Sequence, residues 1–249
     1  PDGNLPVSYL ECGVSDQLII SYAFRSIKES SDLLSTLMSR APLSKDQLAE
    51  CGKLLMFQLS NIRHSGAFQS VFPCFVSCCA RCNRDIPEEL EVWLKETINS
   101  LQTKTQHITR RSGGLPFLII AILSSEKNAS RPMLKYTFDT LIEIAEIPIL
   151  EHEDKLDLPQ VNAFNCIKTL FVESKLSEPC TPYVYPALSL CLKYFTSPVW
   201  AMRNCSIMLF TALQNRLFGK VGKNMSARLF FTRYQGIREV LLEKLQQSV

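Results

Sequence analysis

Apolar residues recur along this chain at intervals of three and four, the spacing that places them on one face of an α-helix. In the first such run, Asp16–Ser39, the positions of Leu18, Ile19 and Tyr22 show this period. No stretch alternates apolar and polar residues over the length of a strand, and no pair of runs is joined as a β-hairpin. The pattern therefore predicts an all-α protein.

Capping residues and prolines predict where the helices begin. Ser44, with Gln47 three positions later, has the pattern of a capping box, and five later helices open at or beside a proline. The expected helices are Asp16–Ser39, a helix opened by Ser44, Ala67–Cys82, Pro87–Leu101, Pro116–Ser125, Pro132–Ile147, Pro159–Ser174, Tyr183–Phe195, Pro198–Phe218, Ala227–Tyr234 and Ile237–Gln246.

Helices of roughly 10–25 residues with short linkers favour stacked antiparallel helical pairs over a closed bundle. No strict repeat is visible, so this α-solenoid prediction rests on helix number and spacing. We expect residues 1–249 to form a single helical-repeat segment of a much longer protein. A compact all-α enzyme domain is the structural alternative.

The composition is that of a globular protein, with 46% apolar and 20% charged residues. The apolar run Leu115–Leu123 is too short to cross a bilayer, and no signal peptide is visible, so we expect a soluble chain without membrane insertion. The ten cysteines lie mostly in apolar helical patterns, which is typical of a reducing compartment, and we expect a cytoplasmic location.

Charge is distributed unevenly along the chain. The net charge is +3, yet the stretch Pro179–Arg238 contains eight basic residues and no acidic one, which leaves −5 for the remainder. This basic end indicates a polyanionic partner, and Lys220, Lys223, Arg228 and Arg233 are the candidate phosphate-binding residues. Some of its cations are expected only to solvate helix faces.

No motif for catalysis or metal binding is found. The segment GKVGKN at Gly219–Asn224 lacks the spacing and the preceding strand of a P-loop. Four cysteines on one expected helix cannot easily surround a tetrahedral zinc, so a packing stripe is the preferred interpretation of Cys74, Cys78, Cys79 and Cys82. We therefore expect a non-enzyme without a metal or cofactor of its own.

One loop, TRRSGGLP at Thr109–Pro116, combines fixed charge with flexible backbone. Its glycines permit close backbone approach, and its arginines are planar donors suited to phosphate or carboxylate. On these grounds alone, a solvated glycine turn whose arginines cap or pair locally explains the loop slightly better than an anion site. The candidate binding residues are Arg110, Arg111, Ser112, Gly113, Gly114, Leu115 and Pro116.

The same loop matches the RRS[AG]G[LI]P signature of the THADA-like (thyroid adenoma-associated) proteins and their fungal counterparts, which this chain resembles. The resemblance extends from about residue 50 onward and departs little, with Gly113 where Ala is common. The other similar blocks are RHSGAFQSVFPCFV (Arg63–Val76), LPQVNAFNCIKTLF (Leu158–Phe171) and SPVWAMRNCSIMLFTALQNRLFG (Ser197–Gly219).

This resemblance implies an armadillo/HEAT-like, non-catalytic scaffold. It implies a partner, an FtsJ-like tRNA 2′-O-methyltransferase that binds S-adenosylmethionine, and a tRNA whose ribose 32 is methylated. Two other functions stay open: a protein-interaction α-solenoid without nucleic-acid contact, and an enzyme in its own right. Salt-dependent tRNA binding would separate the first two, and activity without a partner would indicate the third.

Overall fold

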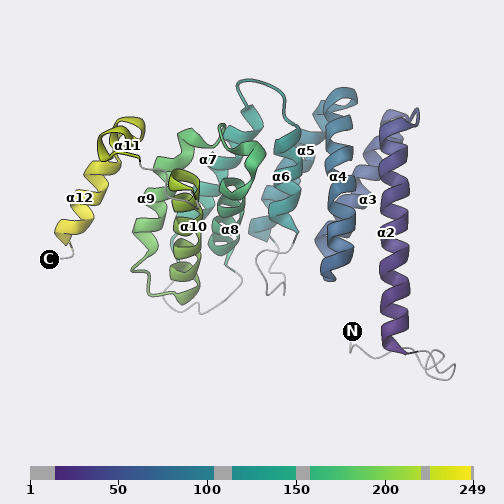
Figure 1. The fold of residues 1–249 in the computed structure, drawn as a ribbon, viewed down its shortest axis with the longest axis horizontal. Helices are drawn as coiled ribbons and strands as arrows, with labels where there is room; N and C mark the ends of the chain where they lie inside the picture. The colour runs from purple at the N-terminus through teal and green to yellow at the C-terminus, as the bar shows by residue number, and fades with distance from the viewer. Residues whose placement is uncertain (1–14, 104–113, 150–157, 220–224, 248–249) are drawn as a thin grey trace. The chain divides into compact units, whose positions relative to one another are not determined.

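The computed structural model describes residues 15–103, 114–149, 158–219 and 225–247, and all regular elements in these ranges are helical (Figure 1). This confirms the all-α prediction. The α-helices are α2 (Asp16–Arg40), α3 (Lys45–Asn61), α4 (Ser65–Asp85), α5 (Pro87–Thr103), α6 (Leu115–Ser125), α7 (Pro132–Glu146), α8 (Pro159–Val172), α9 (Val184–Tyr194), α10 (Trp200–Phe218), α11 (Ala227–Arg233) and α12 (Ile237–Gln247). Two short 3-10 helices, η1 (Ser174–Leu176) and η2 (Thr181–Tyr183), separate α8 from α9.

Local side-chain caps set the helix starts. The capping box before α3 is confirmed: Gln47 N–H donates to Ser44 Oγ at 3.2 Å, and Ser44 N–H donates to Gln47 Oε1 at 2.9 Å. α4 begins two residues before its predicted start because His64 Nδ1 accepts the Ala67 N–H at 3.2 Å. α10 begins two residues after its predicted start at Pro198, with Val199 as its N-cap.

The chain divides into two compact units, residues 1–87 and 88–249. In the first unit, α4 packs against both α2 and α3. Buried apolar side chains of all three helices, including Met38, Leu55 and Phe75, form its core.

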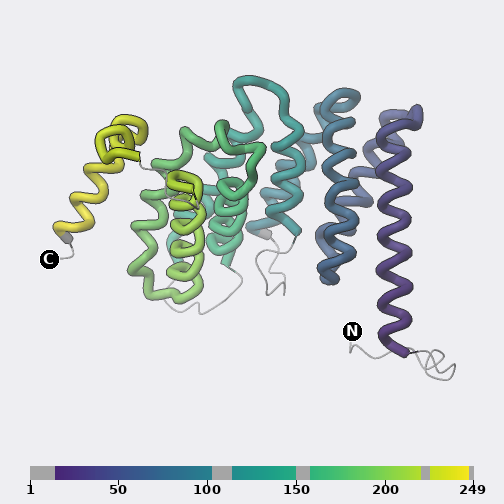
Figure 2. Tube along the Cα trace, viewed as in Figure 1, coloured from purple at the N-terminus to yellow at the C-terminus, as the bar shows by residue number. Residues whose placement is uncertain are grey.

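In the second unit, alternate helices form two layers. α6, α8 and α10 pack side by side in chain order, while α7 and α9 contact each other in the second layer (Figure 2). α7 also packs on α8, and α9 on α10, so the layers are joined by helical pairs. This arrangement agrees with the predicted α-solenoid of stacked pairs.

α6 is the most apolar helix of this unit. All of its residues from Leu118 to Leu123 are buried, as are Pro116 and Ser125. A helix that is apolar on every side needs neighbours on every side, so α6 is fixed in the core. Over the described residues, no helix is both long and apolar enough to cross a membrane.

Candidate functional site

The signature loop is described from Gly114 onward, and Arg110, Arg111, Ser112 and Gly113 lie outside the described residues. Gly114 is buried and acts as the N-cap of α6, with φ −82° and ψ −10°. Its carbonyl oxygen accepts the N–H groups of Phe117 and Leu118, both at 3.1 Å. The loop therefore ends on a helix start that is firmly held by the core.

This helix start offers fewer free donors than an ordinary N-terminus. Pro116 has no N–H, and those of Phe117 and Leu118 are already bonded to Gly114. Leu115 is the residue of this turn whose N–H has no acceptor among the described residues. The contribution of α6 to anion binding is thus confined to that one N–H and the helix dipole.

The other end of α6 is fixed by a buried carboxylate. Glu126 is 3% exposed and accepts the N–H groups of Met133 at 2.8 Å and Leu134 at 3.3 Å, which caps the start of α7. Arg131 has the left-handed φ of 46° and donates to Leu123 O at 3.1 Å. Burial raises the pKa of Glu126, although both backbone hydrogen bonds and the Arg131 charge oppose the shift.

Several cations of the basic end serve the fold itself. Arg203 Nη1 donates to Ser197 O and Pro198 O, and Lys193 lies 3.3 Å from a carboxylate oxygen of Glu146. Arg216 Nη2 donates to Glu173 O at 2.7 Å.

The predicted phosphate-binding residues are only partly described. Lys220 and Lys223 lie outside the described residues, whereas Arg228 and Arg233 are both exposed on α11. The Arg233 guanidinium carbon lies 5.7 Å from the centroid of the Tyr234 ring.

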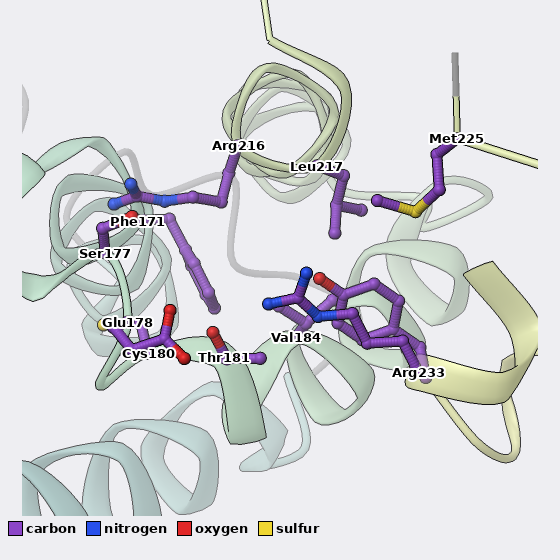
Figure 3. Close-up of a pocket in the computed structure, with 11 residues that line it drawn as sticks. Phe171, Ser177, Glu178, Cys180, Thr181, Val184, Arg216, Leu217, Met225 and Arg233 are labelled. Atoms are coloured by element: carbon purple, nitrogen blue, oxygen red, sulfur yellow. The ribbon is translucent and has the colours of Figure 1, made fainter. Parts of the chain in front are cut away.

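Two arginines of the basic end line one pocket of about 90 Å³ (Figure 3). Arg216 reaches it from α10 and Arg233 from α11, while Glu178 and Thr181 line the wall between α8 and α9. Among the described residues, no carboxylate lies within ion-pair distance of either guanidinium. Arg216 Nε is buried and has no hydrogen-bond partner within the described ranges.

Aromatic packing holds α11 beside this pocket. Phe230 stacks on Phe218 of α10 with ring centroids 5.7 Å apart, and Tyr234 is buried. The turn into α12 needs Gly236, whose φ is +85° and whose missing Cβ would lie 3.0 Å from the ring of Tyr185 in α9. α11 is thus tied to both α9 and α10.

The cysteine cluster predicted to be a packing stripe lies on α4, and all four side chains are buried. Cys78 Sγ and Cys82 Sγ are 3.8 Å apart. The hydrogen bond to Cys82, together with burial, raises the pKa of Cys78, and burial raises that of Cys79. Across the described ranges, no group of three or more potential metal ligands is found.

Charge distribution in the sequence indicated the basic end but not the pocket. Arg216 and Arg233 are separated by 16 residues, and no helical or strand period brings such positions together. The pocket wall formed around Thr181 belongs to a 3-10 segment, which the sequence pattern did not predict. The absence of acidic residues from Pro179 to Arg238 was the available signal.

Comparison with protein families gives two consecutive matches. Residues 7–201 match the family described as THADA/TRM732, DUF2428, and residues 203–249 match the Trm732 C-terminal TPR repeats. The match of the last segment to TPR repeats agrees with the predicted α-solenoid, because TPR proteins are also stacks of helical pairs.

Curated relatives match along the whole chain. The chain is 38% identical to the tRNA (32-2′-O)-methyltransferase regulator trm732 of Schizosaccharomyces pombe, over 100% of this chain and 18% of that protein. It is 34% identical to the tRNA (32-2′-O)-methyltransferase regulator THADA of Gallus gallus and 33% identical to that of Homo sapiens, over 94% of this chain and 14% and 13% of those proteins. The chain thus spans less than a fifth of these relatives, and no solved structure matches it.

Proposed function

Because the chain belongs to the THADA/TRM732 family, we propose that it is a segment of a non-catalytic regulator of a tRNA 2′-O-methyltransferase. The observation that carries this proposal is that two family models cover residues 7–249 almost without a gap, while relatives at 33–38% identity are named regulators of such an enzyme. In this proposal the partner is FtsJ-like, binds S-adenosylmethionine and methylates ribose 32 of the tRNA. The complex acts in the cytoplasm.

The proposed role of this segment is to hold the enzyme and the tRNA in a fixed relation. Structured RNA is recognised largely through phosphates and 2′-hydroxyls, which a rigid helical surface with basic side chains can contact. The segment offers two such regions: the signature loop before α6 and the basic end from Pro179 to Arg238. Methyl transfer itself is assigned to the partner.

The signature loop is the proposed contact for the reacting complex. A turn requires glycine but not two adjacent arginines, and burying an unpaired charge costs several kcal/mol. In α6, to which the loop is attached, Pro116 and all residues from Leu118 to Leu123 are buried, so the loop ends on a helix that is held in the core. We expect Arg110 and Arg111 to bind a carboxylate of the enzyme or a phosphate of the tRNA.

The test uses the full-length protein in complex with its methyltransferase. Replacing both residues, Arg110→Ala with Arg111→Ala, should abolish position-32 methylation and leave the melting temperature nearly unchanged. Lys45→Ala with Lys53→Ala removes two exposed cations from α3 and serves as the charge-matched control, which should retain activity. A folded, fully active arginine variant would remove the loop from the mechanism, and a sharp fall in melting temperature would assign it a structural role.

A protein-interaction scaffold without RNA contact is the second candidate. It is favoured by exposed apolar side chains in the first unit, among them Tyr22 at 75%, Leu33 at 62% and Phe57 at 66% exposure. The two candidates differ in a salt series. A regulator that touches tRNA should raise the affinity of the complex for tRNA and steepen its dependence on salt, whereas a pure protein scaffold should change neither.

A further inference from the structure

We propose that the pocket between α10 and α11 binds a single backbone phosphate of the tRNA, held between Arg216 and Arg233. The proposal rests on the proposed function, because it takes the RNA from there. It adds a defined phosphate site, made by residues that come together only in the folded chain.

Size restricts what the pocket can hold. Its volume of about 90 Å³ is far below the several hundred Å³ typical of sites for nucleotides or drug-sized ligands. This is enough room for several water molecules or for one tetrahedral anion. The pocket therefore fits one anionic group of a larger molecule that stays outside.

The donors in the pocket suit a phosphate. Arg216, which lines the pocket, is held in place by its bond to Glu173 O, and its buried Nε–H has no acceptor in the described part of the chain. Arg233 is exposed, and its guanidinium is directed into the pocket (Figure 3). The hydroxyls of Thr181 and Ser177 line the same pocket. Phosphate oxygens accept from guanidinium and hydroxyl groups alike, and guanidinium bonds to them are charge-assisted.

Among the described residues that line this pocket, Glu178 is the one with an acidic side chain, and it makes the proposal testable in two directions. Its carboxylate repels an anion, while the two guanidinium groups outweigh it by one positive charge. Removing the carboxylate should therefore strengthen phosphate binding, and removing a guanidinium should weaken it. A pocket with a purely structural role predicts no such opposite effects.

A phosphate is favoured over a carboxylate from a protein partner by the surrounding charge. The chain has no acidic residue from Pro179 to Arg238, a stretch that includes both pocket arginines, and polyanions are attracted to such a region over a distance of about 10 Å at moderate salt. A single carboxylate on a protein surface would gain much less from this extended field than a chain of phosphates.

The experiment measures tRNA binding by the full-length protein with its methyltransferase across a salt series. Arg233→Gln should lower the affinity about tenfold and reduce the salt slope by about one. Glu178→Gln should raise the affinity about two- to threefold. Arg238→Gln on α12 is the control, because Arg238 is exposed, carries the same charge and does not line the pocket. It should change the affinity less than twofold.

The possible results of this experiment separate the phosphate pocket from general charge, from a protein partner and from the proposed function itself. Equal losses with Arg233→Gln and Arg238→Gln would show that only general charge matters and would overturn the pocket, leaving the proposed function intact. Loss of methyltransferase capture by Arg233→Gln, with tRNA affinity unchanged, would overturn the phosphate in favour of a protein carboxylate. If the wild-type regulator adds nothing to tRNA binding at any salt concentration, the RNA-binding part of the proposed function fails together with the pocket.

Discussion

Arg81 should hold the end of α2 in place, and its replacement should loosen that end selectively. Its Nη1 donates to Met38 O at 2.7 Å and to Ala41 O at 2.8 Å, two carbonyls at the end of α2. Carbonyls of a last helical turn have no partner within the helix, and the Arg81 side chain is only 12% exposed, so little water can replace it.

The expected effect of Arg81→Met follows from these contacts. A hydrogen bond to a charged group contributes about 1.5–3 kcal/mol net, and two bonds from one nitrogen contribute less than twice that. We expect a loss of about 2–3 kcal/mol in local stability. Backbone amides at the end of α2, residues 36–41, should then exchange hydrogen roughly 30- to 150-fold faster in the full-length protein.

Arg84→Met is the matched control. Arg84 lies on the same helix as Arg81, and both bond the carboxylate of Asp85. The Arg84 side chain is 70% exposed and has no hydrogen bond to a described carbonyl of α2. This variant should leave exchange in α2 unchanged. Equal protection of residues 36–41 in the wild type and in Arg81→Met would refute the reasoning, because it would show that packing of Met38 alone fixes this end.

Three further predictions concern thiol reactivity, zinc and pH. Cys51, which is half-buried, should react with iodoacetamide before the buried thiols of Cys78, Cys79 and Cys166. Burial also raises the pKa of Cys166 to about 12, which keeps that thiol protonated. Rapid labelling of Cys166 in the native protein would contradict this prediction. Chelator-washed protein should also retain no stoichiometric zinc, and its presence would assign the α4 cysteines to a metal site. Burial raises the pKa of Glu126 above its ordinary value of 4.5, so the folded state binds this proton more tightly than the unfolded chain. The stability that this difference contributes is present below pH 4.5 and is lost as pH rises through the raised pKa. Glu126→Gln should remove this pH dependence from the urea midpoint of unfolding. A variant whose pH profile is identical to that of the wild type would contradict the prediction.

The helices themselves could be predicted because their apolar period repeats over many residues. Their ends could not be predicted as well, because single side chains decide them. His64 starts α4 by accepting one N–H, and Glu173 ends α8 at Val172 by accepting the N–H of Lys175, where the apolar period predicted a helix to Ser174. Both are bonds of a kind that composition does not reveal.

In the candidate site, too, some features could be predicted from the sequence and others could not. The signature loop could be found from the sequence because its residues are consecutive, and the basic end because its charge is contiguous. The pocket requires that α11 lie beside α10, which depends on the Phe218–Phe230 stack between the two helices. Such long-range contacts have no local period, so the sequence indicated the charges but not their meeting point.

The unequal anchoring of the two pocket arginines has a consequence for how a scaffold would act on RNA. Arg216 is already ordered by its bond to Glu173 O, whereas Arg233 is exposed and must lose side-chain freedom of up to about 2 kcal/mol when it binds. A phosphate in this pocket would therefore be positioned chiefly by Arg216 and attracted chiefly by Arg233. Since methyl transfer depends on placing one ribose within a fraction of an ångström, loosening Arg216 should impair methylation more than tRNA affinity, while neutralising Arg233 should do the reverse.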